Sequence, residues 1–200
     1  SGVWYNFILT VNGTTAKLYI DGSQFGSNIT VGSVRTGIGS EAVLGKYNFG
    51  TYANLDGKMS NVAIWNSDQS ANIADIYNNG SPQTTYTVTP QNWWKLNSTS
   101  VYTPSVASYS KALDFGGTDY IDCGVVSAVE NVSSFSMSVW AYPTNGAFKS
   151  IIGNWGNPYV GVEIGTSSGA VYFTVDSDTA GSGYGAVSYT HLTLPTSFEV

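Results

Sequence analysis

Residues 7–22 read FILTVNGTTAKLYIDG, and this stretch decides the fold class. Large apolar side chains recur at positions 7, 9 and 11, a period of two that is typical of a strand with one buried face. The pair Asn12-Gly13 favours the positive φ angles of a tight turn, and a second short strand follows over residues 18–20. The pair Asp21-Gly22 then marks another turn. Two strands joined by a short polar loop predict an antiparallel hairpin.

The composition favours an all-β protein with many turns. Of the 200 residues, 42% are hydrophobic and 10% are charged, and there are 23 glycines and 14 tyrosines. The net charge of −6 and the lack of a basic stripe argue against nucleic acid as a partner. No apolar run approaches the roughly 18 residues of a membrane helix, so we expect no membrane insertion. Because the chain begins with Ser1 rather than Met, we expect a fragment or a processed product.

Residues 58–65, KMSNVAIW, predict a later strand. Strict alternation places Met59 and Trp65 on one of its faces and Val62 and Ile64 on the other. Because both faces carry apolar side chains, we expect this strand to be buried on both sides at its end. Further short strands, separated by Gly, Asn and Ser turns, are predicted over residues 112–115, 120–123, 135–142, 150–152, 159–164 and 170–175.

One short helix is predicted near residues 71–78. Ile73, Ile76 and Tyr77 form its apolar stripe. Ser70 is its expected cap, and Gly80 is placed to end it in a left-handed conformation. The polar and β-branched residues 81–91, which include two prolines, then predict a linker.

Several motifs of the chain occur in a recognisable order. One group of motifs lies late in the chain and consists of ALDFGG at 112–117, DYID at 119–122 and FSMSVW at 135–140. A second group lies early in the chain and consists of the strands at 4–11 and 55–65, LYIDG at 18–22, LGK at 44–46 and IYNNG at 76–80. They resemble, respectively, the opening and closing segments of the laminin-G-like, concanavalin A-like jelly-roll family. The resemblance covers most of residues 3–175 and implies an antiparallel β-sandwich.

The closing motifs precede the opening motifs in this chain. We therefore expect residues 1–83 to be the C-terminal half of one repeat, 84–91 a linker and 92–186 the N-terminal half of the next, as in a fragment of a tandem array. Because the halves are complementary, we expect one permuted sandwich; two separate half-sheets are the alternative. Its inward residues are predicted to be Phe7, Leu9, Val11, Leu18, Ile20, Val62, Ile64, Leu113, Phe115, Phe135, Met137, Val139, Ile151, Val162 and Phe173.

The last residues look foreign to the rest of the chain. Residues 187–196 read VSYTHLTLPT and resemble one translated reading frame of a transposase-based DNA-sequencing adapter. We therefore interpret residues 187–200 as an artefactual tail and leave them out of the fold prediction. The alternative is a natural polar terminus.

No catalytic set emerges from the sequence. The single histidine, His191, lies in this tail, which leaves no Ser-His-Asp or Cys-His pair elsewhere. Glycosidases of the concanavalin A-like fold use paired carboxylates a few residues apart on one strand, and such pairs are what hydrolysis of a glycosidic bond needs. The four glutamates are instead far apart: Glu41, Glu130, Glu163 and Glu199. We therefore expect no enzymatic activity.

Two acidic residues are candidate calcium ligands. Asp176 and Asp178 share the end of a predicted strand, and calcium prefers carboxylate and carbonyl oxygens. The alternative is that both are ordinary turn residues, since Asp is common at turns.

Aromatic and amide side chains provide the candidate glycan site. Trp155 lies beside Asn154 in a turn-rich loop with Tyr159 nearby, and Tyr47 and Tyr52 lie in the loop of residues 45–54. Aromatic rings stack on sugars, and amides hydrogen-bond their hydroxyl groups. Loop anchoring or core packing is the alternative for these rings.

These observations indicate a non-catalytic jelly-roll module from an extracellular, cell-surface or virion protein. Its expected partners are glycans or surface polysaccharides and neighbouring repeats of the same chain, with calcium as a candidate cofactor. A structural spacer that binds nothing small is the alternative. A polysaccharide hydrolase is disfavoured by the missing carboxylate pair.

Overall fold

Strands from distant parts of the chain pair in one large antiparallel sheet in the computed structural model of this protein. The structure describes residues 3–31, 41–46, 54–96, 112–129, 132–144, 149–153, 161–167, 169–175 and 190–191. Within them, the sheet has seven strands in the order β3-β2-β1-β9-β5-β6, with β7 also paired to β5. The strands are β1 (Tyr5–Asn12), β2 (Thr15–Ile20), β3 (Ser23–Thr30), β5 (Asp56–Trp65), β6 (Asn92–Trp94), β7 (Leu113–Gly116) and β9 (Ser134–Pro143).

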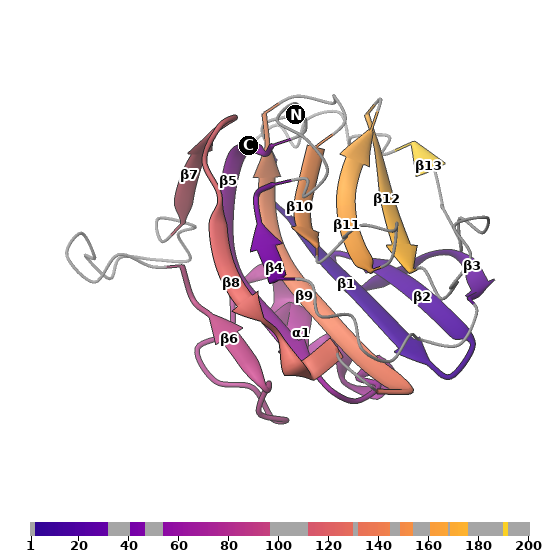
Figure 1. Cartoon of the computed structure of the whole chain (residues 1–200). Helices are drawn as coiled ribbons and strands as arrows, with labels where there is room; N and C mark the ends of the chain where they lie inside the picture. Colours follow the sequence, from indigo (N-terminus) through magenta and orange to yellow (C-terminus); the bar gives the residue numbers. More distant parts are fainter. Residues whose placement is uncertain are drawn as a thin grey trace.

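A second antiparallel sheet packs against the first (Figure 1). Its six described strands have the order β13-β12-β11-β10-β4-β8. They are β4 (Glu41–Leu44), β8 (Ile121–Val125), β10 (Lys149–Gly153), β11 (Val162–Ser167), β12 (Ala170–Val175) and β13 (Thr190–His191). The molecule is therefore the all-β antiparallel sandwich that the sequence predicts, and the prediction of the fold class is confirmed.

The predicted hairpin is formed by β1 and β2, which pair from Phe7↔Ile20 to Asn12↔Thr15. Its loop is Gly13-Thr14, with a positive φ of 56° at Gly13, so the turn lies one residue later than the predicted Asn12-Gly13. The next turn follows the prediction, because Asp21 and Gly22 have φ angles of 48° and 77°.

Strands from before and after residues 84–91 alternate in both sheets. β9 lies between β1 and β5, and β4 lies between β10 and β8. The longest of these pairings joins β1 to β9 over eight residue pairs, from Tyr5↔Ala141 to Asn12↔Ser134. The segments that the sequence assigns to two half-domains thus share sheets in this chain.

One main core lies between the sheets and draws apolar side chains from both segments. Every predicted inward residue except Leu113 belongs to it. Each such burial contributes about 1.5–3 kcal/mol to folding. The prediction for Leu113 is wrong: its residue is 36% exposed because it begins β7, which the described residues flank on one side only, by β5.

A β-bulge in β5 changes which of its side chains face the core. The pairing with β9 shifts register between Ser60 and Ala63, and Asn61 has a φ of +52°. The extra residue moves Met59 onto the same face as Val62 and Ile64, in the main core. The strict alternation predicted for this strand therefore fails at the bulge.

The outer face of the large sheet carries a second apolar cluster. It is covered by α1 (Ile73–Tyr77), which is flanked by the 3-10 turns η1 (Ser70–Asn72) and η2 (Asn78–Gly80); a further turn, η3 (Ser127–Val129), precedes β9. The helical stripe is confirmed for Ile73 and Ile76, which are buried, while Tyr77 is partly buried and stacks on Trp140. The cluster consists of Ile8, Tyr19, Ala63, Trp65, Ile73, Ile76 and Tyr86, with Trp93 packed against it.

The helical segment begins differently from the prediction, and an additional left-handed residue precedes the predicted end. Asp68, rather than Ser70, provides the capping oxygen: its Oδ1 accepts a hydrogen bond from the Ser70 backbone N–H at 2.9 Å. α1 ends at Tyr77, and the next residue, Asn78, is left-handed with φ 50° and ψ 49°. Asn tolerates this conformation better than most residues. Gly80, the last residue of η2, also has a positive φ of 86°, as the sequence predicts.

Residues 81–91 lie on the outer cluster as a strap. The Tyr86 ring makes an edge contact with Trp65 at 5.1 Å between ring centroids. The backbone N–H and the hydroxyl of Thr87 both donate to the Asp75 carboxylate at 3.0 Å. Trp65 Nε1 donates to the backbone oxygen of Val88 at 2.8 Å. These contacts hold the predicted linker against the sheet at several points.

The described part of the C-terminal tail is a short strand. Thr190 and His191 form β13, which pairs with β12 through Ala170↔His191 and Val171↔Thr190. These two residues belong to the segment that the sequence predicts to be an artefactual tail.

Candidate binding groove

The residues predicted to bind a ligand lie outside the described part of the chain. They are Trp155, Asn154, Tyr159, Tyr47 and Tyr52 for a glycan, and Asp176 and Asp178 for calcium. Their roles stay predictions. Within the described ranges, no group of three or more His, Cys, Asp or Glu side chains could hold a metal ion.

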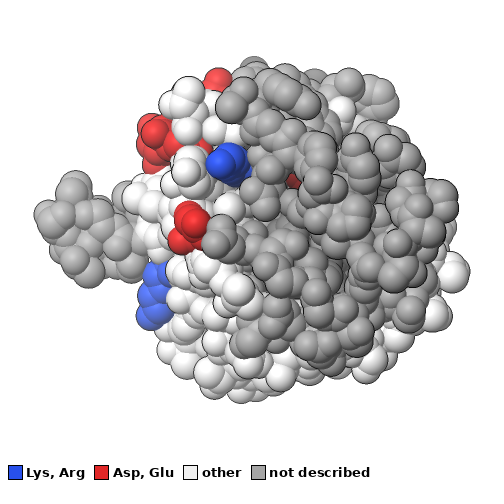
Figure 2. Space-filling model, viewed as in Figure 1, with Lys and Arg blue, Asp and Glu red and all other residues white. Residues whose placement is uncertain are grey.

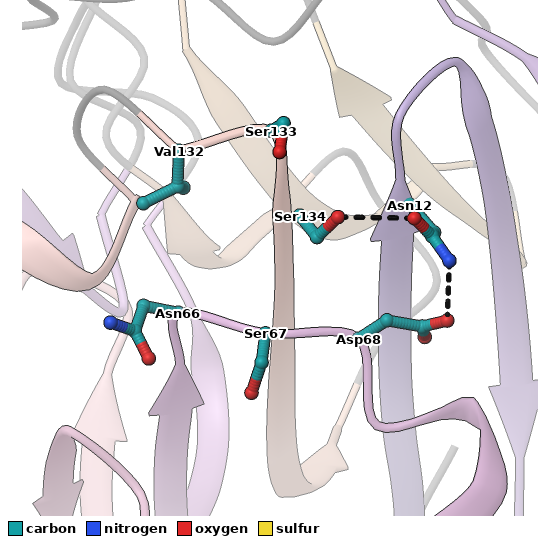
Figure 3. Close-up of a pocket in the computed structure, with 7 residues that line it drawn as sticks. All are labelled: Asn12, Asn66, Ser67, Asp68, Val132, Ser133 and Ser134. Atoms are coloured by element: carbon teal, nitrogen blue, oxygen red, sulfur yellow. Dashed lines mark hydrogen bonds between the residues drawn. The ribbon is translucent and has the colours of Figure 1, made fainter.

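The structure shows a different candidate, a polar groove at one end of the large sheet. It has a volume of about 510 Å³ and is lined by Asn12 at the end of β1, residues 66–68 after β5 and residues 132–134 at the start of β9. Figure 3 shows the last two segments running side by side, with Asn12 joining them at one end. These three strand ends meet because β9 pairs antiparallel with both β1 and β5.

Hydrogen bonds hold the side chain of Asn12 across this end of the groove (Figure 3). Its Nδ2 donates to Asp68 Oδ2 at 3.1 Å, and its Oδ1 accepts from Ser134 Oγ at 3.1 Å. The backbone N–H of Gly13 also donates to the Ser133 carbonyl at 2.9 Å. The hairpin and the start of β9 are therefore tied together at the groove.

The segment after β5 is fixed from the sheet side. Ser136 Oγ on β9 accepts from the Gln69 backbone N–H at 2.8 Å and donates to the Ser67 carbonyl at 3.0 Å. The carboxylate of Asp68 accepts from both the backbone and the hydroxyl of Ser70. These bonds preorganise the polar wall, which reduces the ordering cost of binding a ligand.

A smaller side pocket adjoins the groove. Its volume is about 250 Å³. Asn12 and Asp68 line both hollows, so their hydrogen bond lies at the boundary between them. The side pocket is lined by Thr10, Asn12, Thr15, Lys17, Asn28, Asp68 and Ser70.

The chemistry of this lining suits hydrogen bonding rather than catalysis. The groove presents amide and hydroxyl groups, and its described lining contains one carboxylate and no His or Cys. Amides and hydroxyls are donors and acceptors at once, which matches the hydroxyl groups of a polyol. Burial, and to a lesser degree the negative charge of Asp68, raises the pKa of the neighbouring Tyr19.

Sequence reasoning missed the groove because each segment looks like an ordinary turn. Asn, Ser and Asp are common wherever strands end. The available signal was that polar residues end β1, follow β5 and lead into β9, at residues 12, 66–68 and 133–134. Combining these three segments into one site requires the order of the strands in the sheet, which the sequence alone does not give.

Glu163 is a buried carboxyl on the small sheet, away from the groove. Its residue is 3% exposed. Burial is the largest influence and raises its pKa to about 7, while interactions with the hydroxyls of Ser150 and Tyr172 lower it. Ser150 and Tyr172 both pair with Gly165, and a Cβ there would lie 2.6 Å from Tyr172 Cζ, so the glycine makes room for the ring.

The comparisons with known proteins identify the first part of the chain. Residues 1–72 match a family model described as the concanavalin A-like lectin/glucanases superfamily. These residues are therefore similar to that superfamily. The match confirms the resemblance for the concanavalin A-like segment that carries most of the closing motifs. No curated protein and no solved structure matches the chain.

The charged side chains of the described surface are unevenly distributed. Figure 2 shows that the charged side chains of the viewed face gather toward one edge, while the remaining described surface there is uncharged. An exposed ion pair joins Lys58 to Asp114 at 3.5 Å. Among the described helices, none is long and apolar enough to cross a membrane.

Proposed function

We propose that this chain is a non-catalytic concanavalin A-like module that binds glycans and serves surface adhesion. The observation that carries the proposal is the polar groove, in which amide and hydroxyl groups from three strand ends are held in place by hydrogen bonds. Saccharides are recognised through many hydroxyl groups, so a preorganised wall of neutral donors and acceptors suits them.

The superfamily includes glucanases by name, so the non-catalytic part of the proposal needs its own support. Hydrolysis of a glycosidic bond uses two carboxyl groups about 5–9.5 Å apart. On β11, Glu163 is followed by Ile164, Gly165, Thr166 and Ser167, which provide no second carboxyl group. In the groove, Asp68 already accepts hydrogen bonds from Asn12 and Ser70.

The wider setting is part of the same proposal. A glycan-binding module fits an extracellular, cell-surface or virion protein, in which repeats of this kind follow one another in tandem. Trp155 with its neighbours remains the proposed stacking platform, and Asp176 and Asp178 the proposed calcium ligands. Residues 1–83 and 92–186 remain the proposed halves of successive repeats.

A glycan array probed with the whole chain tests the function. The test variant is Asn66→Ala: Asn66 is exposed, lines the groove and forms no hydrogen bond among the described residues, so its loss should not affect folding. The matched control is Asp114→Ala, at an exposed ion pair on β7 that contributes little to stability.

We expect binding to one class of neutral glycan, weakened by the Asn66 variant and unchanged by the control. Trp155→Ala on the same array tests the proposed stacking platform separately. Binding to no glycan on the array would refute the function and favour the structural spacer.

A further inference from the structure

The groove and the side pocket together indicate the length and the charge of the glycan that the site can bind. We infer that the bound glycan is an uncharged oligosaccharide of at least two units, which crosses the hydrogen-bonded pair of Asn12 and Asp68 from the groove into the side pocket. This inference rests on the proposed function and specifies the ligand of the same site.

The length follows from the two hollows. They measure about 510 and 250 Å³ and share Asn12 and Asp68, while each has polar groups of its own. Those of the groove include Asn66 and Ser133, and those of the side pocket include Thr15, Lys17 and Asn28. A ligand confined to one hollow leaves the polar groups of the other hollow hydrated, whereas a longer oligosaccharide can form hydrogen bonds with the polar groups of both.

The shared pair can itself contact a bridging ligand. A side-chain amide has two N–H donors and an oxygen with two lone pairs. Asn12 uses one N–H on Asp68 and one lone pair on Ser134, among the hydrogen bonds of the described residues. One donor and one acceptor of Asn12 thus remain at the boundary, where a sugar hydroxyl between two units would lie.

The absence of net charge on the ligand follows from the charges around the site. The two hollows are lined by one carboxylate, Asp68, and one ammonium group, Lys17, among their described residues. Recognition of sulfated or uronate chains depends on clustered Lys and Arg, because each anionic group needs a cation. Here the single Lys17 is offset by Asp68, and the net charge of the chain is −6.

A titration series tests this inference. Glucose, galactose and mannose and their neutral di- and tetrasaccharides are titrated calorimetrically, beside uronate and sulfated oligosaccharides of equal length. For the sugar that binds, we expect the disaccharide to bind at least about tenfold more tightly than the monosaccharide. Asn28→Ala, in the side pocket, should abolish that gain. Asn66→Ala should weaken both.

The outcomes separate this inference from the proposed function. Equal affinity for mono- and disaccharides, preference for the acidic series, or a length gain that survives both Asn28→Ala and Lys17→Ala would overturn the inference and leave glycan binding intact. Binding of no probe, and of no glycan on the array, would overturn both. Asp114→Ala and the thermal melt of each variant control for misfolding.

Discussion

Protonation of Glu163 should make the stability of this protein depend on pH. Burial raises the pKa of this carboxyl to about 7 in the folded protein, from the 4.5 of an ordinary glutamate in water. Because the folded state binds the proton more tightly than the unfolded chain, acid favours folding. The stabilising contribution is complete below about pH 4.5 and is lost as the pH rises through about 7.

The size of this effect follows from the two pKa values. A difference of about 2.5 corresponds to roughly 3 kcal/mol, at about 1.4 kcal/mol for each pKa unit. Glu163→Gln keeps the shape of the side chain and carries no charge at any pH. The variant should therefore match the wild type near pH 4.5 and be more stable by up to roughly 3 kcal/mol at pH 8.

Urea unfolding of both proteins at pH 4.5, 6, 7 and 8 measures the difference. Contributions that the two proteins share cancel in the comparison between them. A difference between Glu163→Gln and the wild type that stays flat between pH 4.5 and 8 would refute the reasoning, since it would mean that burial does not disfavour the charged form.

Three further changes test other features. Gly22→Val should lower the free energy of unfolding by at least about 1–2 kcal/mol, because φ is +77° and a Cβ there would lie 2.6 Å from Tyr77 Cδ1; an unchanged melt would contradict the observed turn. Asn61→Gly keeps the left-handed bulge but removes the acceptor of the 2.6 Å bond from Trp93 Nε1, which should cost about 1–3 kcal/mol in chemical denaturation. Asn61→Ala should lower the free energy of unfolding further, because alanine tolerates a positive φ less well than glycine. Equal losses in the two variants would show that the φ angle at residue 61 does not affect stability. Deleting residues 187–200 should cost no more than about 1–2 kcal/mol by thermal melting, since the described contribution is the two-residue strand β13; a larger loss would show a packed role for the tail.

The sequence predicted the features that depend on local periodicity. The β1–β2 hairpin, the apolar stripe of the helix and the inward residues of β9 follow from spacing and turn residues, which act within a few positions. The predictions failed where one extra residue shifts the alternation of a strand, and where the burial of a residue depends on strands that are distant in the sequence. The bulge at Asn61 reverses the faces of β5, and Leu113 is exposed because, among the described strands, its strand is paired on one side only.

The candidate site depends on tertiary structure more than those features of the fold do. Asn12, Asp68 and Ser134 are up to 122 residues apart in the chain and meet because β9 lies beside β1 and β5. No pattern within one segment indicates such a meeting. The predicted aromatic set centred on Trp155 lies outside the described residues and stays a prediction.

The pairing of β1 with β9 also determines when the large sheet can form during synthesis. Tyr5 pairs with Ala141, 136 residues later in the chain (141 − 5). At typical translation rates of about 5–20 residues per second, β1 waits roughly 7–27 s for this partner to be made. During that interval one edge of the β1–β2 hairpin is open to pairing with other chains. We therefore expect that a chaperone would protect this edge while the protein is still bound to the ribosome.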